Sequence, residues 1–472
     1  MKANPVGCII ISLFLLFSAG SVQSEVLTLG NCIDLALENR ASIISVRGNE
    51  ELSKANRRTA LGAFLPRLDA SYGYSETRSR DGMFETQIPT GEFLFVIDTT
   101  FVDGLTGESI TREIIAQGYQ GMEIVEQDQK DQDRTSKSLR LDASISVFNL
   151  SSWFDLAASG AERTKAHLDV IASEQDLVLS VKVSYYAYLA MVENVTVQQD
   201  AVKRSEEQLK LIQSRYDLGS AALSDVLKQK VQFGNDRLSL LSAQNAATTA
   251  KADLAYTIGI DPNRETDFVT DYTPREFVGS MEDALKFGLK RHPGLLASEK
   301  KTDAARHHLR SAKAGYLPTV SAYAGLNWYD GTQGDTVIYN SSSRSMTGGF
   351  QVSFNIFDGF LREKRVSSAK VNRNNALAQL TESRNRVTVD IKKAYLDIEK
   401  TRQQRIVAEE NVEAATEDLK ISKEKYNLGA ATILDLLTAQ ESLKSAQVSL
   451  ISVGFDLNLA VARLENAMGK FL

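Results

Sequence analysis

Few residues of this 472-residue sequence are of the types that carry out catalysis or bind metal ions in clusters. The four histidines are His167, His292, His307 and His308. His307 and His308 are adjacent, so a helix would direct their side chains to different sides and away from a common metal ion. No glycine-rich phosphate loop and no nucleophile elbow stands out. We therefore expect no catalytic residues, no metal site and no cofactor, and the protein is predicted not to be an enzyme.

Charge and cysteine content narrow the function further. The sequence has 54 Lys and Arg against 60 Asp and Glu, a net charge of -6, which excludes a broadly basic nucleic-acid-binding protein. Hydrophobic residues make up 43% of the chain, which excludes wholesale disorder. Beyond the N-terminal leader the chain has one cysteine, Cys32, so no internal disulfide is expected.

Residues 1–24 have the pattern of a secretory signal peptide. Lys2 precedes an apolar run, Val6–Phe17, and small residues ending at Ser24 offer a cleavage site. The run is too short to span a membrane as a helix, which needs about 20 apolar residues. No later segment is expected to span a membrane as a helix, and the protein is predicted to be exported.

The rest of the sequence is an internal repeat. Leu37–Gly73 aligns with Leu289–Gly325 at a shift of 252, and the segment from Val181 to Gly259 aligns with one ending at Gly469 at a shift of 210. Between these segments, Ser144–Asn149 aligns with Ser353–Asp358 at a shift of 209. Because the shift falls from 252 to 209, the first half carries 43 additional residues. We predict a first structural repeat over residues 25–260, a linker over 261–280 and a second repeat over 281–472.

Each repeat is expected to contain two strands. Apolar and polar residues alternate in four segments of about ten residues, at 68–75, 139–147, 319–328 and 350–356. That length suits a membrane β-barrel, although half-buried strands of a soluble sandwich would give the same local pattern. Four strands cannot close a barrel and an open edge is unstable in lipid, so a membrane location requires several chains in one barrel.

Long helices are expected on either side of these strands. The first runs from Leu29 to Ala63 and ends before Pro66. Proline is absent from about 152–218 and 361–428, so each of these segments is predicted to form one helix of roughly 100 Å. Apolar and small residues recur at alternating spacings of three and four near the end of each, as in a coiled coil, although core contacts within an ordinary helical bundle would give the same spacing. Gly219 and Gly429 are expected to end these helices in left-handed caps before new helices begin near Leu223 and Ile433.

With these features in this order, the sequence resembles the TolC-like family of outer-membrane efflux proteins. The residues that carry the resemblance recur in both halves and are Leu27–Leu29, Ala36–Asn39, Phe64–Pro66, Tyr216–Gly219 and Asp225, then Met281–Leu285, Arg291–Pro293, Tyr316–Pro318, Asn355–Gly359, Tyr426–Gly429 and Asp435. The fold that the resemblance implies is mainly α with a membrane β-barrel portion. Each duplicated chain would supply four barrel strands and long coiled-coil helices to a trimeric α/β-barrel duct.

The resemblance implies an outer-membrane channel of a tripartite efflux or type I secretion system. Its homotrimer would span outer-membrane lipid in a Gram-negative-type cell and extend far into the periplasm. A periplasmic adaptor (membrane fusion) protein and an inner-membrane pump would deliver solutes or proteins to it. The alternative function is a structural coiled-coil cell-surface protein, which would leave the four strands unexplained.

The resemblance also assigns roles to residues at the helical tips. Gly219 and Gly429 match turns that bind the adaptor, while Tyr426 and Asp225 match partners that hold the tunnel entrance closed. Asp435 matches an acidic position at the pore constriction, and the alternative role for it is a helix cap. The sequence departs from the pattern of some members at two nearby positions, Ala431 and Thr438.

The additional residues of the first half fall between its two strands, at about 76–136. The family topology makes this segment a long outer loop that faces the outside of the cell. It contains Phe93–Ile97, which is too apolar for a wholly solvated loop. A small added hairpin, a lid over the barrel mouth and an inert insertion are all compatible with the sequence.

Overall fold

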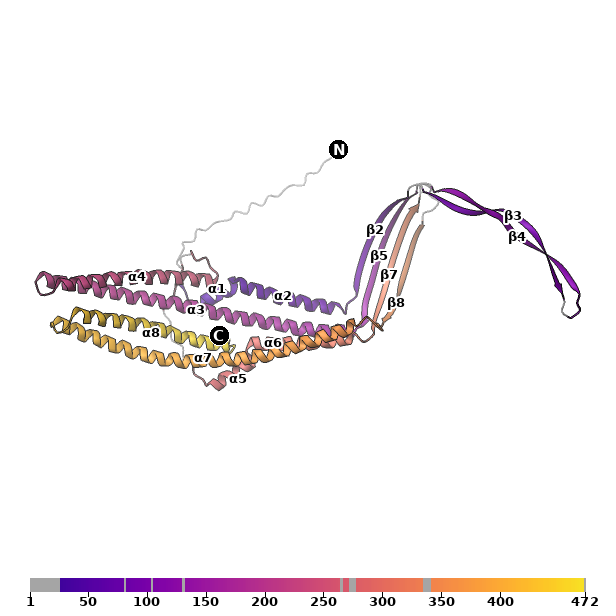
Figure 1. Cartoon of the computed structure of the whole chain (residues 1–472). Helices are drawn as coiled ribbons and strands as arrows, with labels where there is room; N and C mark the ends of the chain where they lie inside the picture. The colour runs from indigo at the N-terminus through magenta and orange to yellow at the C-terminus, as the bar shows by residue number, and fades with distance from the viewer. Residues whose placement is uncertain are drawn as a thin grey trace, which may run out of the picture. The chain divides into compact units, whose positions relative to one another are not determined.

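The structure is a computed structural model that describes residues 26–79, 82–102, 105–129, 132–263, 266–270, 277–333 and 341–470. The predicted signal peptide lies outside the described residues. The chain divides into two compact units. The helical unit consists of residues 1–60, 153–314 and 359–472, and the strand unit of residues 61–152 and 315–358 (Figure 1).

Eight helices make up most of the described part of the helical unit. In chain order they are α1 (Leu29–Asn39), α2 (Ala41–Gly62), α3 (Leu150–Asp217), α4 (Leu223–Ile258), α5 (Met281–Arg291), α6 (Pro293–Ala314), α7 (Leu361–Asn427) and α8 (Ile433–Ala467). With 68 and 67 residues, α3 and α7 confirm the two very long helices predicted from the sequence. Each turns back into a shorter partner, giving the hairpins α3–α4 and α7–α8 (Figure 1). A short parallel pair, β1 (Val26–Leu27) with β6 (Asp267–Phe268), ties the start of the described chain to the segment after α4.

The predicted helix from Leu29 to Ala63 is interrupted at Arg40, which has an extended conformation between α1 and α2. His292 has the same conformation between α5 and α6, where Pro293 disfavours a helical conformation in the residue before it. Arg40 is not followed by proline. Instead, its Nη1 donates a hydrogen bond of 2.8 Å to the carbonyl of Tyr256, and its guanidinium carbon lies 4.6 Å from the centroid of that ring. A tertiary contact with α4 therefore stabilises the break in the first half.

Buried residues that the sequence repeat aligns occupy equivalent places in the helical core. One cluster includes Cys32, Ile43, Val181 and Leu254, and the other includes their aligned counterparts Ala284, Leu295, Ile391 and Leu464. In each, a short helix packs its small residues against a long helix and its hairpin partner. Burial raises the pKa of the Cys32 thiol to about 12, so this group stays protonated and acts as a small apolar core residue.

By length and composition alone, α8 is long and apolar enough to cross a membrane, which corrects the expectation that no later segment is. Part of its apolar surface is used inside the helical unit, since 33% of its most apolar stretch is buried. Phe455 packs in the first core cluster, and Val461 and Leu464 pack in the second. The apolar composition of α8 is therefore explained in part by packing against helices of both halves.

Four strands of the strand unit form an antiparallel sheet in the order β2-β5-β7-β8. They are β2 (Arg67–Ser79), β5 (Gln132–Phe148), β7 (Thr319–Gln333) and β8 (Ser341–Ser353). With 13 to 17 residues, they are longer than the ten predicted, because pairing continues into polar residues that give no alternating apolar signal. β8 also ends at Ser353, so residues 354–356 lie beyond the strand in which they were expected.

The sheet carries its large apolar side chains on one face, and they are exposed. Leu68 and Tyr72 of β2 are 77% and 65% exposed, and Phe350 of β8 is 78% exposed. The register places Leu68 opposite Ala143 on this face and pairs Asp69 with Asp142 on the other face. An apolar face beside a polar face, over strands of this length, is what a membrane barrel requires.

The segment expected as a long outer loop forms a second, two-stranded antiparallel hairpin of β3 (Gly82–Val102) and β4 (Ser109–Gln129). Ser79 pairs with Gln132 at the end of β2 and β5, and Gly82 pairs with Gln129 at the start of the hairpin. The hairpin is a separate sheet and has 21 residues in each strand, about 70 Å. The sequence was compatible with an added hairpin, a lid or an inert insertion, and the backbone of this segment forms a hairpin.

Candidate site at the tips of the helical hairpins

Two tight turns of the same construction join the long helices to their partners. Gly219 and Gly429 have φ angles of 74° and 72°, in the left-handed region that glycine adopts without strain. The Gly219 N–H donates to the carbonyl of Tyr216, and the Gly429 N–H donates to that of Tyr426, at 2.8 and 3.1 Å. A Cβ atom added at either glycine would meet nothing within 4 Å. Backbone conformation, and not crowding, therefore favours glycine at both tips.

Large apolar side chains beside these turns are in contact with water. Leu218 and Leu428, which precede the glycines, are 83% and 84% exposed. Leu223 and Leu434, in the first turns of α4 and α8, are also exposed. Exposed apolar residues gathered at one place indicate a surface that contacts a partner. Sequence reasoning assigned the glycines to this surface and included Leu218 and Leu428 in the repeated tip motif, but it did not identify the leucines as exposed contact residues.

Tyr426 lies behind the turns in a small apolar cluster, only 9% exposed. Ile212, Val226, Ile433 and Leu436 complete the buried part of this cluster. Because these residues come from α3, α4, α7 and α8, the cluster holds the two hairpins together at their tips. Burial is the main cause that raises the pKa of Tyr426, and the negative charge of Asp225 raises it further. The structure thus brings Tyr426 and Asp225, predicted to be partners, close enough to interact electrostatically.

Arg215 of α3 adds a link that sequence reasoning missed. Its Nη2 donates a hydrogen bond of 3.0 Å to Oδ1 of Asn427, and its guanidinium carbon lies 5.9 Å from the centroid of the Tyr426 ring. A cation in that position is attracted by the ring and joins one hairpin to the other. A signal was present, because Arg215 and Lys425 are basic residues one position before the tyrosine in the two tip motifs.

Asp435 caps the first turn of α8. Its Oδ2 accepts hydrogen bonds from the backbone N–H and the hydroxyl of Thr432, at 2.8 and 2.7 Å, while its own N–H donates to Thr432 Oγ1. This reciprocal arrangement is a capping box. The hydrogen bonds from Thr432 lower the pKa of Asp435, so the exposed carboxylate is charged at neutral pH. The helix cap, which the sequence offered as the alternative role for Asp435, is therefore present. The charged carboxylate of Asp435 remains exposed to water in this cap.

The corresponding start of α4 is built differently. Its N-cap residue is Ala222, which makes no side-chain capping bond. Asp225 is half-buried, and its Oδ1 accepts a long hydrogen bond of 3.4 Å from Ser224. The two aspartates that the repeat aligns therefore differ in role: Asp435 stabilises its own helix, and Asp225 acts on Tyr426 of the other hairpin.

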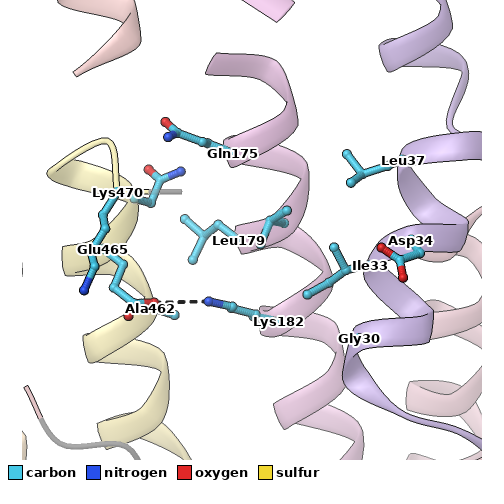
Figure 2. A pocket seen from close by; sticks show the side chains of 12 residues that line it. Gly30, Ile33, Asp34, Leu37, Gln175, Leu179, Lys182, Ala462, Glu465 and Lys470 are labelled. Atoms are coloured by element: carbon cyan, nitrogen blue, oxygen red, sulfur yellow. Dashed lines mark hydrogen bonds and ion pairs between the residues drawn. The ribbon is translucent and has the colours of Figure 1, made fainter. Parts of the chain in front are cut away.

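Two shielded ion pairs link α8 to the first hairpin away from the tips. Lys444 lies 3.2 Å from Asp236 of α4, and Glu465 lies 3.2 Å from Lys182 of α3. Figure 2 shows the second pair beside a cavity of about 290 Å³ whose wall includes Ile33 and Leu179. Among the described residues, no group of His, Cys, Asp or Glu could hold a metal ion. These two ion pairs therefore join α8 to helices of the first hairpin.

The sequence profile of a known family, described as outer membrane efflux protein, matches residues 32–259 and 286–470. The chain belongs to the outer membrane efflux protein family. TolC from Vibrio cholerae is 24% identical over 357 residues, which are 74% of this chain and 80% of that protein. Among solved structures, a membrane protein from Pseudomonas aeruginosa has a TM-score of 0.73 at 17% identity and covers 93% of both chains. VceC from Vibrio cholerae has a TM-score of 0.70 at 18% identity over 93% of this chain and 96% of that chain.

Membership of this family confirms the resemblance seen in the sequence. This efflux protein is an outer-membrane channel component and not an enzyme. The solved structures share its fold, a mostly helical chain with a smaller set of strands. A coiled-coil surface protein, the alternative function, is not supported, because the family match extends through both halves.

Proposed function

We propose that three copies of this efflux protein form one duct through the outer membrane, with a barrel of twelve strands. The observation that carries the proposal is the four-stranded sheet, whose outer strands β2 and β8 each have one unpaired edge among the described strands. Its exposed apolar face would contact lipid, and lipid cannot satisfy the hydrogen-bonding groups of an open edge. Joining β8 of one copy to β2 of the next closes the sheet.

The helices support the same assembly. On α4, the residues Leu227, Val231, Leu238 and Leu241 are 53%, 64%, 64% and 60% exposed. Together with Gly234 they follow spacings of four and three, which is the seam of a coiled coil. Among the described residues of one chain, no helix covers this seam, since these four leucine and valine side chains are more than half exposed. Helices of neighbouring copies would cover it and complete a periplasmic tunnel below the barrel.

The tips would then be the periplasmic end of the duct. The surface around Gly219 and Gly429, with its exposed leucines, would bind the periplasmic adaptor that connects an inner-membrane pump. Tyr426, Asp225 and Arg215 would hold the entrance closed, and Asp435 from three copies would form an acidic ring at the constriction. Solutes or proteins from the pump would pass outward without chemical change. The proposal includes removal of residues 1–24 and two structural repeats, 25–260 and 281–472.

The test is the mass of the full-length protein extracted in detergent, measured together with channel activity in planar bilayers. The expected result is a particle of three chains that conducts ions. A stable monomer would contradict both the shared barrel and the tunnel. Release of the protein from membranes without detergent would instead favour the surface coiled coil.

A further inference from the structure

Basic residues gather at the ends of the helices that adjoin the four-stranded sheet. Within eight residues of those ends, α2, α3, α6 and α7 have seven basic residues and two acidic ones, Asp155 and Glu363. The basic residues form the set named here the basic collar: Arg57, Arg58, Arg310, Lys313, Arg362, Lys364 and Arg365. The whole chain has a net charge of -6, so the basic collar reverses the charge balance of the protein.

Chain connectivity keeps the basic collar close to one end of the sheet. At that end Arg67 pairs with Ser144 and Thr319 pairs with Ser353, and connections of one to seven residues join the strands to the four helices. A fully extended connection of seven residues spans only about 25 Å. Large apolar side chains are exposed beside these connections, namely Leu65, Phe148, Leu317 and Phe354. In the proposed duct the sheet leaves the lipid here, which places the basic collar at the level of the lipid head groups.

Most of the basic collar has no charge partner in the chain. Farther from the sheet, basic residues of the same helices are neutralised: Lys54 lies 3.1 Å from Glu50, and Arg306 lies 3.2 Å from Asp303. Cations that are paired at one level and unpaired at the next indicate an anion from outside the chain. The collar residues that form no ion pair with any described residue are Arg57, Arg58, Arg310, Lys313, Lys364 and Arg365.

The helix dipole explains only part of the basic collar. Arg310 and Lys313 lie near the C-terminal end of α6, where the partial negative charge of a helix favours cations. Lys364 and Arg365 lie in the first two turns of α7, where the partial positive charge of the helix disfavours them. What the two groups share is their nearness to the sheet. Helix stability therefore does not account for the basic collar, whereas a location beside a membrane does.

A cavity at the start of α7 gives an anionic group room to bind. Its volume is about 840 Å³, and Glu162 is the one acidic residue in its described lining. Glu162 is already occupied, since its Oε1 lies 2.9 Å from Nε2 of His308. Asp169 pairs with one of the lysines, Lys165, and leaves the others uncompensated by a carboxylate. The basic residues that line the cavity are Lys165, Lys301, Lys364 and Arg365.

We propose that the basic collar binds the anionic head groups of phospholipids in the periplasmic leaflet of the outer membrane. This inference rests on the proposed duct, whose strands bring the basic collar to that leaflet. Lysine and arginine donate charge-assisted hydrogen bonds to phosphate. Basic residues beside a membrane attract anionic lipids, and basic pockets between helices hold their head groups. Bound head groups would neutralise the unpaired cations and fix the depth of the duct in the membrane.

Delipidated full-length protein in a neutral detergent provides the test. Thermal melting is measured with added phosphatidylglycerol, or with phosphatidylcholine of the same acyl chains, whose head group has no net charge. Phosphatidylglycerol should raise the melting temperature by several degrees more than phosphatidylcholine does. The difference between the two lipids should shrink at high salt, because salt screens exposed charges.

Two double variants with the same change of charge separate the basic collar from other cations. Lys364→Gln with Arg365→Gln should remove most of the difference between the two lipids, while Lys364→Arg with Arg365→Lys should retain it. The matched control is Lys300→Gln with Arg306→Gln, whose cations are already paired with Asp303. This control should keep the lipid difference of the parent protein.

Three results would overturn the inference and leave the duct intact in a protein of trimeric mass. The first is equal stabilisation by the two lipids, and the second is an equal lipid difference in the collar variant and its control. The third is stabilisation by inorganic phosphate equal to that by phosphatidylglycerol, which would assign the basic collar to a soluble anion. Monomeric mass in the parent protein would overturn the proposed function as well.

Discussion

Lys444 of α8 and Asp236 of α4 form an ion pair that is almost wholly shielded from water. Lys444 Nζ lies 3.2 Å from Asp236 Oδ1, and the two side chains are only 14% and 6% exposed. Glu441 adds a second carboxylate on the lysine. Burial alone would lower the pKa of Lys444, but the hydrogen bond to Glu441 and the charge of Asp236 outweigh it and raise that pKa. The pair therefore fastens the second hairpin to the first.

Removing one partner of this pair should destabilise the helical unit. Asp236→Ala leaves Lys444 with a single, more exposed partner, so we expect a loss of about 3 kcal/mol in unfolding free energy. The double variant Asp236→Leu with Lys444→Met should recover most of that loss, because no buried charge remains. Thermal melting followed by helical circular dichroism measures both. The control is Lys420→Met, whose partner Glu417 is exposed, and its effect should be under about 1 kcal/mol.

The pH dependence of the pair follows from the raised pKa of Lys444. A lysine whose pKa is higher in the folded state stabilises the fold fully below its ordinary value of 10.5. That stabilisation is lost as the pH rises through the raised value. The difference in melting temperature between the parent and Lys444→Met should therefore shrink only in strongly alkaline buffer. A difference that vanished near neutral pH would contradict the assignment.

Much of the helical unit could be predicted from the sequence because its signals are local. Long segments without proline predicted α3 and α7, and the glycines at 219 and 429 predicted the turns that follow them. The break at Arg40 could not be predicted, because it depends on Tyr256, 216 residues away. The ion pair of Lys444 with Asp236 could not be predicted from the sequence either, because the two residues are 208 positions apart. The repeat aligns Lys444 with Gly234 and Asp236 with Ala446, so the two equivalent positions cannot form a similar ion pair.

For the strands and the candidate site too, local patterns could be predicted from the sequence, whereas contacts between distant residues could not. Alternation located β2, β5 and β7, but it failed for the polar ends, where backbone pairing extends the strands without apolar residues. The apolar segment 93–97 indicated that the outer segment is not a simple loop, yet the continuous register of its hairpin is a property of pairing. At the tips, the motif predicted Tyr426 and Asp225, while the contact of Arg215 with the Tyr426 ring depends on α3 and α7 lying side by side.

The tip glycines should tolerate asparagine and not leucine. Gly219→Leu or Gly429→Leu forces a branched side chain into a left-handed conformation, at a cost of about 1–2 kcal/mol. The turn should distort and adaptor binding should fall, while trimer assembly stays normal. Gly219→Asn and Gly429→Asn are the controls, since asparagine adopts this conformation more readily. Site-specific cross-linking to the adaptor is the measurement, and normal cross-linking of both leucine variants would exclude a role for the turns.

The cap of α8 should depend on Thr432. Thr432→Ala removes the hydroxyl that accepts from the Asp435 N–H, which should cost about 1 kcal/mol and speed hydrogen exchange in the first turn of α8. Thr438→Ala, which removes only a hydroxyl bonded within the helix, is the control. Because the pKa of Asp435 is lowered, the cap is complete above its ordinary value of 3.8. Protection should be lost as the pH falls through the lowered value, and equal protection in both variants would exclude the cap.

Arg215 should help to keep the entrance closed. Arg215→Ala removes the hydrogen bond to Asn427 and the contact with the Tyr426 ring, so the tips of the two hairpins should separate more readily. We expect a higher single-channel conductance and more frequent open states in planar bilayers. Lys203→Ala, at an exposed position of the same helix, should conduct like the parent. Parent-like conductance of Arg215→Ala would show that other contacts close the entrance.

Asp435 should determine the cation preference of the channel. Three carboxylates around a narrow, water-filled opening repel one another and attract cations, and solvent screening moderates both effects. Asp435→Asn keeps the size of the side chain and an oxygen that can accept from the Thr432 N–H, but it deletes the charge. It should therefore reduce cation selectivity and weaken block by multivalent cations in single-channel recordings, while the trimeric mass is unchanged. Asp225→Asn is the comparison, because Asp225 is half-buried beside Tyr426 and should affect opening more than selectivity. If Asp435→Asn has the selectivity and block of the parent, Asp435 serves only as the cap of α8, and the constriction is formed by other residues.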